Sequence, residues 1–165
     1  MFVCFIDFQK AFDRVWRKAL FLKLHSKGIR GKFYNLLRDM YSNTLYFCKD
    51  KNLYSKPFLA NQGVKLGDSF SRILFNIFID DIKECFNTEL SDPVKLSVNE
   101  FNHLLYADDL VLISETSTGL QHCIDCLQKN SMDWRLDVNF KKTKIIVFTR
   151  KISKKDKYFF NMGLI

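Results

Sequence analysis

Residues that interrupt regular structure are scarce in this chain, which has two prolines and six glycines among 165 residues. So few breakers, together with seventeen phenylalanines, exclude extended disorder except near the ends. Long apolar runs are missing too, because none approaches the roughly 18 residues that a membrane helix needs. The length suffices for one core, so we expect a single folded domain and no membrane partner.

Cysteine is sparse and irregularly placed. The five cysteines are Cys4, Cys48, Cys85, Cys123 and Cys126. An odd, scattered set is typical of reduced core thiols and excludes the paired framework of a small secreted domain. The pair Cys123 and Cys126 matches C-x-x-C, but it has no second pair and only His122 nearby, so we expect helix packing rather than zinc. The protein is therefore expected to be intracellular, nuclear or cytoplasmic, and not secreted.

Positive charge is in excess. The formal net charge is +8 and the sequence pI is near 9.3. Lysine and arginine gain by displacing counterions from a phosphate backbone, which favours a nucleic acid as partner. A soluble basic surface would have the same composition, and charge alone leaves both interpretations open.

The most informative pattern runs from Leu104 to Ile113, where two apolar runs flank Asp108 and Asp109. Each run predicts a buried strand, and the polar interruption predicts a tight turn. Adjacent carboxylates repel, so they need a cation or open water. A hard divalent cation with oxygen ligands would suit them. The alternative is an ordinary hairpin with a solvated turn.

A second acidic strand lies at the start of the chain, where the apolar run Phe2–Ile6 leads into Asp7 and is followed by Phe12 and Asp13. Carboxylates that come from two remote strands can surround two metal ions about 3.5–4 Å apart. Residues 5–13 and 106–109 resemble motifs A and C of reverse transcriptases, specifically those of non-LTR (LINE-type) retrotransposons. The order of the motifs and their separation fit this family as well.

Residues 63–76 resemble motif B of the same family, and Leu74, Phe75 and Asn76 match its Leu-Phe-Asn. Two positions depart from the motif. Leu66, beside Gly67, stands where the family has a glutamine that contacts nucleotide and template, and leucine has no hydrogen-bonding group to replace it. Arg72 stands where the family has a proline. Gln62 lies four residues too early to substitute, but Ser69 or Ser71 can cap the helix, which we expect to form.

Residues 136–148 resemble motif D, with a strand, a basic turn and a second strand. In the family, Asn-x-x-Lys-Thr-Lys places a lysine near the triphosphate, where a cation stabilises or protonates the leaving pyrophosphate. Asn139, Lys142 and Lys144 match those positions. By itself, such a turn would be interpreted as a solvated basic loop.

Periodicity predicts the remaining elements. Helices are expected near residues 15–27, 32–41, 69–82 and 117–135, and an antiparallel pair near 44–48 and 54–59. Apolar stripes that include Phe33 and Leu36, and Phe70 and Ile73, are expected to face the core. Asp80 with its neighbour Asp81 is expected to form a solvated helix face.

The resemblance implies an α+β fold, the palm subdomain of a right-hand polymerase, with an antiparallel sheet and helices packed on one face. We expect a palm-like domain over residues 1–150, lacking fingers and thumb, and residues 151–165 as a basic tail that begins a further strand at 158–161. The family's activity is RNA-directed DNA polymerisation, with an RNA template, a DNA primer and deoxynucleoside triphosphates. The motifs predict no particular oligomeric state.

The resemblance also assigns the site residues. Asp7, Asp108 and Asp109 would hold two Mg²⁺ ions, with Mn²⁺ as a substitute, and Lys142 would act beside them. Phe12 matches the gate against the nucleotide 2′-hydroxyl, although core packing would explain it as well. The alternative function is an inactive retrotransposon remnant that folds and at most binds nucleic acid. Leu66, Arg72 and the missing flanks favour that alternative, and we expect the chain to be inactive alone.

Overall fold

The structure is a computed structural model that describes residues 1–165 except 43, 66, 87–88, 150–157 and 163–165. The chain divides into two compact units, Met1–Ala11 with Ile79–Ile165, and Phe12–Phe78. We call them the sheet unit and the helical unit and describe each by itself. The single domain expected from length is thus subdivided, because residues 12–78 pack mainly among themselves.

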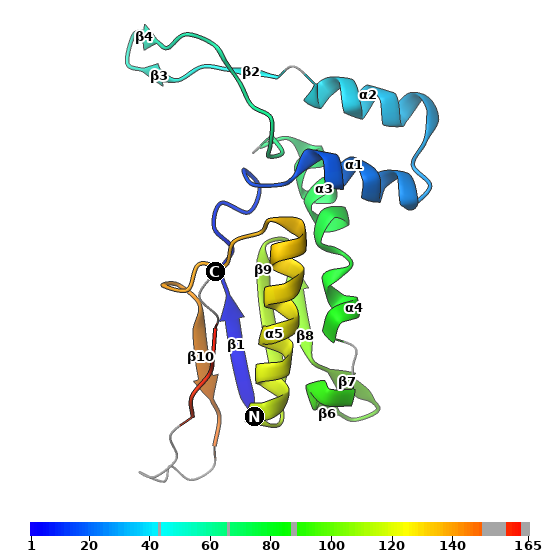
Figure 1. Cartoon of the computed structure of the whole chain (residues 1–165), viewed down its shortest axis with the longest axis vertical. Helices are drawn as coiled ribbons and strands as arrows, with labels where there is room; N and C mark the ends of the chain where they lie inside the picture. The colour runs from blue at the N-terminus through cyan, green and yellow to red at the C-terminus, as the bar shows by residue number, and fades with distance from the viewer. Residues whose placement is uncertain (43, 66, 87–88, 150–157, 163–165) are drawn as a thin grey trace. The chain divides into compact units, whose positions relative to one another are not determined.

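The sheet unit is built on a four-stranded antiparallel sheet in the order β10-β1-β9-β8. Its strands are β1 (Phe2–Ile6), β8 (His103–Tyr106), β9 (Asp109–Ser114) and β10 (Lys144–Val147). A smaller hairpin pairs β6 (Val94–Leu96) with β7 (Asn99–Phe101), after the 3₁₀ helix η1 (Glu89–Ser91). Figure 1 shows β1 between β10 and β9, so the first strand of the chain lies inside the sheet.

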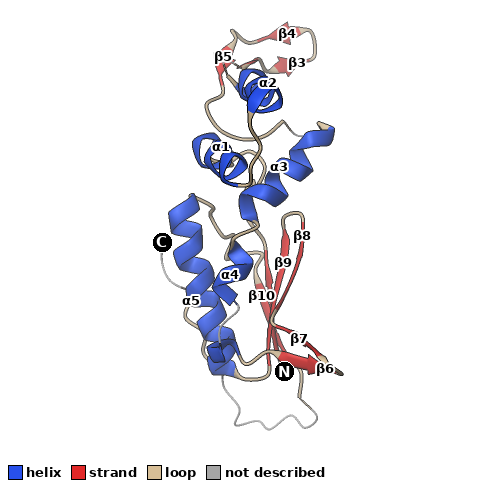
Figure 2. Ribbon diagram, turned by 90° about the vertical axis from the view of Figure 1, so that its right-hand side faces the viewer, coloured by secondary structure: helices blue, strands red, loops and turns tan. Residues whose placement is uncertain are grey.

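Two helices of the sheet unit, α4 (Ile82–Phe86) and α5 (Ser117–Trp134), lie on the same side of the sheet (Figure 2). Side chains alternate across a strand, so β1 turns Cys4 and Ile6 towards these helices and leaves Phe5 exposed. On α5 the predicted stripe is buried, with Leu120, Cys123, Ile124 and Leu127 all nearly inaccessible. The predicted α+β fold with helices on one face of an antiparallel sheet is therefore confirmed.

The helical unit contains α1 (Arg17–Ser26), α2 (Gly31–Tyr41) and most of α3 (Ser69–Ile79). Between α2 and α3 the chain forms an arm of two short ladders. In this arm β2 (Leu45–Tyr46) pairs with β5 (Phe58–Leu59), and β3 (Lys49–Asp50) pairs with β4 (Leu53–Tyr54). The predicted antiparallel pair is present, divided into these two ladders of two residue pairs each.

The apolar stripes of α2 and α3 were assigned in part to the wrong face. Phe33 and Leu36 of α2 are exposed, as are Phe70 and Ile73 of α3. The helix α3 is apolar on two sides, and periodicity cannot choose between them. The structure buries the side that carries Phe75, whose ring stacks on that of Phe12 with centroids 4.8 Å apart.

Two details of the helix ends also differ from expectation. Asp68, not Ser69 or Ser71, caps α3, because its carboxylate accepts the Phe70 N–H at 3.2 Å while the Ser71 hydroxyl donates to the Lys65 carbonyl. The acids Asp80 and Asp81 do not lie on a continuous helix. They stand between α3 and α4, at the start of a new helix, where aspartate is favoured.

The strand expected at residues 158–161 is absent, and the basic run 151–157 lies outside the described residues. Residues 158–162 are held by side chains instead of a ladder. The Gln121 amide donates to the Asn161 carbonyl at 2.8 Å and accepts the Asn161 N–H at 2.9 Å. The Phe2 ring contacts that of Tyr158 edge-on, with centroids 4.9 Å apart. In the described part of the chain, no helix combines the length and the apolar character needed to cross a bilayer.

Candidate active site

The predicted acids come together at one end of the sheet. In the antiparallel register Ile6 of β1 faces Leu110 of β9. Asp7 follows the last residue of β1 and Asp109 is the first residue of β9, so the two residues lie at the same end of the sheet. Backbone register alone therefore joins the two sequence motifs, which are about a hundred residues apart.

Asp108 lies in the two-residue turn between β8 and β9, which Tyr106 and Asp109 close as a cross-strand pair. Ala107, the first turn residue, has φ 53°, a left-handed value that costs a residue with a side chain of order 1–2 kcal/mol. Strain of this kind is found at functional turns. The turn holds Asp108 at the hairpin tip beside Asp109.

The three acids are open to solvent. The Asp7 side chain is 41% exposed, Asp108 is half-buried and Asp109 is exposed. Carboxylate oxygens are the ligands that hard divalent cations prefer. Among the described residues, no three His, Cys, Asp or Glu side chains are gathered closely enough to form a metal-binding group. The chemistry of the donors fits Mg²⁺, and the three-carboxylate site stays a prediction.

The motif D residues lie next to Asp7. The Asn139 N–H donates to the Asp7 carbonyl at 2.7 Å, and the Asp7 N–H donates to the Thr143 hydroxyl at 3.3 Å. Phe8 and Val138 form an isolated antiparallel bridge one residue further on. The turn predicted as basic is thus bound to the residue that carries the first acid.

The two lysines of this turn have different surroundings. Lys142 Nζ is 4.0 Å from Asp7 Oδ2, and its side chain is 71% exposed, so the pair contributes little to stability. Lys144 Nζ donates to the Lys141 carbonyl at 3.1 Å. Of the predicted cations, Lys142 is therefore the one beside the acids.

The predicted nucleotide-contacting residues of motifs A and B belong to the helical unit. Phe12 is half-buried and stacks on Phe75, which is the packing role that the sequence left open beside the gate. Gly67 is exposed with φ +89°, a conformation that glycine adopts without strain. Leu66 lies outside the described residues. Arg72 is exposed near the start of α3, and the helix forms there as expected.

Sequence reasoning missed the residues that hold these loops. Thr143 was part of a matched motif, but nothing in the pattern shows that its hydroxyl binds the Asp7 backbone. In the helical unit the buried Arg17 donates to the carbonyls of Gly63, Tyr41 and Ala60 at 2.7, 2.8 and 2.5 Å. An arginine at the start of a helix gives no signal of this role.

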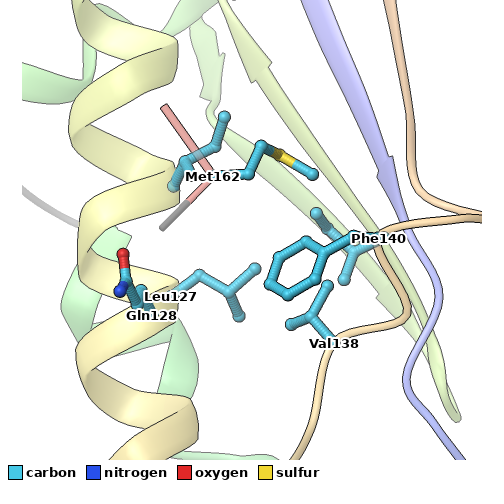
Figure 3. A pocket seen from close by; sticks show the side chains of 7 residues that line it. Leu127, Gln128, Val138, Phe140 and Met162 are labelled. Atoms are coloured by element: carbon cyan, nitrogen blue, oxygen red, sulfur yellow. The ribbon is translucent and has the colours of Figure 1, made fainter. Parts of the chain in front are cut away.

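A small apolar pocket lies beside the site, between α5 and the loop that follows it (Figure 3). Its lining residues are Ile6, Ile124, Leu127, Gln128, Val138, Phe140 and Met162. Ile6 immediately precedes Asp7, and Phe140 immediately follows Asn139. Because the lining is apolar apart from Gln128, the pocket offers no acid or base and belongs to the packing behind the acids.

Known proteins resemble the chain along most of its length. The family described as reverse transcriptase (RNA-dependent DNA polymerase) matches residues 1–163. A probable RNA-directed DNA polymerase from transposon BS of Drosophila melanogaster is 32% identical over 154 residues, which cover 89% of this chain and 16% of that protein. The Pol polyprotein of retrotransposable element R2DM, from the same species, is 30% identical over 124 residues and is covered to 12%. The chain thus spans about a sixth or less of these two relatives.

Solved structures agree on the fold. Telomerase from Candida tropicalis in complex with a fragment of telomeric RNA matches with a TM-score of 0.67 at 17% identity, over 88% of this chain and 26% of that one. Telomerase is a right-hand polymerase, so the predicted palm architecture is confirmed. The relatives are polymerases of non-LTR retrotransposons, as the motifs predict. Because the match to this family runs over residues 1–163, nearly the whole chain, the chain belongs to the reverse transcriptase (RNA-dependent DNA polymerase) family.

Proposed function

We propose that this chain provides the nucleotidyl-transfer site of an RNA-directed DNA polymerase of the non-LTR retrotransposon type. The observation that supports the proposal is the register Ile6–Leu110, because Asp7 follows Ile6 and Asp109 precedes Leu110, beside the turn that carries Asp108. The substrates would be an RNA template, a DNA primer and deoxynucleoside triphosphates, and the protein would act inside the cell. The net charge of +8 supports a polyanionic partner.

Asp7, Asp108 and Asp109 would hold two Mg²⁺ ions, for which Mn²⁺ could substitute. When bound, such ions acidify the attacking hydroxyl and neutralise the phosphates of the nucleotide. The side chains of the chain would contribute by orienting the reacting groups and by stabilising charge. The exposed ammonium of Lys142, 4.0 Å from Asp7, would meet the negative charge that develops on the leaving pyrophosphate.

The test is primer extension on an RNA template by the full-length polypeptide that carries this chain. Asp108→Asn and Asp7→Asn should each lower kcat by about 100- to 1,000-fold, because each removes a charge that stabilises the transition state. The matched control is Asp80→Asn, which removes an acid that is paired with Lys83 at 2.6 Å and lies outside the proposed site. This variant should keep the wild-type rate.

The alternative function, an inactive remnant that binds nucleic acid, predicts a different result. The wild-type polypeptide would then bind an RNA–DNA duplex and extend no primer. Leu66→Gln restores the amide that motif B of the family carries. This variant should therefore be tested in the same primer-extension assay. No extension even with Leu66→Gln would overturn the polymerase proposal and favour the remnant.

A further inference from the structure

The backbone of Asp7 lies just beyond the regular sheet. The pairing of β1 with β9 ends at Ile6 and Leu110, and its pairing with β10 ends at Phe5 and Lys144. The ladder therefore leaves the N–H and C=O of Asp7 without strand partners. A backbone donor and acceptor at the edge of a core need other partners to hold them in one place.

Those partners come from the loop 139–143. The Asp7 carbonyl accepts the Asn139 N–H at 2.7 Å, and the Asp7 N–H donates to the Thr143 Oγ1 at 3.3 Å. The loop is closed on itself, because the Asn139 carbonyl accepts the N–H groups of Lys142 at 3.1 Å and Thr143 at 2.9 Å. Both backbone groups of Asp7 are thus bound to one short, internally bonded loop.

Only one of these two bonds is made by a side chain. Thr143 is 6% exposed, so its hydroxyl has little access to water and is directed at the Asp7 backbone. We propose that Thr143 is a positioning residue for Asp7, holding the acid so that its carboxylate faces the metal ions. The proposal rests on the function proposed above, which gives the Asp7 carboxylate a cation to bind.

Lys142, the residue before Thr143, shows why the hydrogen bond between Thr143 and Asp7 matters for the proposed site. Lys142 Nζ is 4.0 Å from Asp7 Oδ2, so the same loop carries a cation beside the carboxylate and a hydroxyl on the backbone. A functional group must stay within about 0.5 Å of its working position. Residues that orient metal ligands in this way typically change metal affinity or activity by about 10- to 100-fold when they are replaced.

Two substitutions separate positioning from plain packing. Thr143→Val keeps the shape of the buried side chain and removes the hydroxyl, whereas Thr143→Ser keeps the hydroxyl and removes the methyl group. If Thr143 acts through its hydrogen bond, only valine should be harmful. If it acts by filling space, serine should be the harmful substitution, because it leaves a cavity.

The experiment measures two quantities on the full-length polypeptide. One is the dissociation constant for Mn²⁺ alone, by electron paramagnetic resonance. The other is the Mg²⁺ concentration that gives half-maximal primer extension. Thr143→Val should raise both by about 10-fold, and Thr143→Ser should restore both to within about 2-fold of wild type. Equal effects of valine and serine, or none from either, would overturn the proposal.

The Mn²⁺ measurement keeps this proposal separate from the polymerase proposal. Asp7→Asn must weaken Mn²⁺ binding, since Thr143 is proposed to act through that carboxylate. Suppose that Asp7→Asn weakens Mn²⁺ binding but no variant extends a primer. The polymerase proposal has then failed, and the ratio of the Mn²⁺ dissociation constants of Thr143→Val and Thr143→Ser still decides the role of Thr143. If wild-type Mn²⁺ binding is absent or insensitive to Asp7→Asn, the positioning role is overturned.

Discussion

The two units hold their loops in different ways. In the sheet unit, β1 pairs along its whole length with β9 and nearly so with β10, and the motif D loop continues this network onto Asp7. In the helical unit the ladders of the arm are two residues long. There the guanidinium of Arg17 joins the segment before α3 to the end of α2, in addition to backbone bonds from Ala60, Gly63 and Val64.

This difference predicts which single substitutions should destabilise each unit most. A ladder spreads its stabilisation over many backbone bonds, none of which depends on a particular side chain. A buried charged side chain concentrates stabilisation in one residue, and each hydrogen bond from a charged donor is worth about 1.5–3 kcal/mol. One substitution should therefore loosen the helical unit more than any single substitution on the exposed face of the sheet.

Arg17→Met should have the largest effect. Methionine fills much of the same space but leaves the carbonyls of Gly63, Tyr41 and Ala60 without their donor, so the helical unit should lose about 3 kcal/mol or more of its opening free energy. Hydrogen–deuterium exchange should show faster exchange in peptides from residues 12–78 than in those from 79–148. Arg38→Met, on the exposed side of α2, is the matched control and should change little. Equal loss of protection in both units would contradict the comparison.

Gly63→Ala should have the next largest effect. Gly63 has φ +81°, and an added Cβ would stand 2.6 Å from the Asp13 carbonyl oxygen, so the substitution combines backbone strain with a clash. Gly67 has φ +89° but open space around it, and Gly67→Ala isolates the strain of about 1–2 kcal/mol. We expect Gly63→Ala to destabilise the helical unit further, as measured by urea unfolding. If the two variants lose the same free energy of unfolding, the Asp13 backbone must shift to relieve the clash, which would contradict this prediction.

Thiol reactivity should distinguish the units without any substitution. Burial raises the pKa of Cys4 and of Cys123 in the sheet unit to about 12, whereas Cys48 in the arm is exposed. The thiolate is the reactive form, so at pH 8 iodoacetamide should modify Cys48 and leave Cys4 and Cys123 intact.

The same pKa shifts predict an effect of pH on stability. The folded pKa of both thiols lies above the unfolded value of 9.0, so their burial stabilises the sheet unit fully below pH 9. This stabilisation is lost as pH rises towards 12, and unfolding monitored from pH 8 to pH 11 should show the decline. In the iodoacetamide experiment, rapid modification of Cys4 at pH 8 would contradict the comparison, because it would show that the sheet unit opens more readily than its strand pairing implies.

Much of the fold follows from local sequence. The apolar runs at residues 2–6 and 110–113 predict the two central strands, and the helix near 117–135 is found as α5 over Ser117–Trp134. The expectation at residues 158–161 failed because a strand needs an available edge. There the Gln121 side chain takes the place of a partner strand. The prediction of which side is buried was also wrong in part for α2 and α3. For α3 the reason is that a helix apolar on two sides does not specify which side packs.

The sequence by itself determined most of the elements, the candidate acids and the family, because apolar runs, an Asp-Asp turn and a basic motif are patterns of neighbouring residues. Only the tertiary structure decided that Asp7 and Asp109 lie at the same end of the sheet, that Lys142 lies beside Asp7 and that Thr143 holds its backbone. Each of those contacts joins residues about a hundred or more positions apart. Their geometry depends on how the strands pair, and no local pattern encodes that pairing.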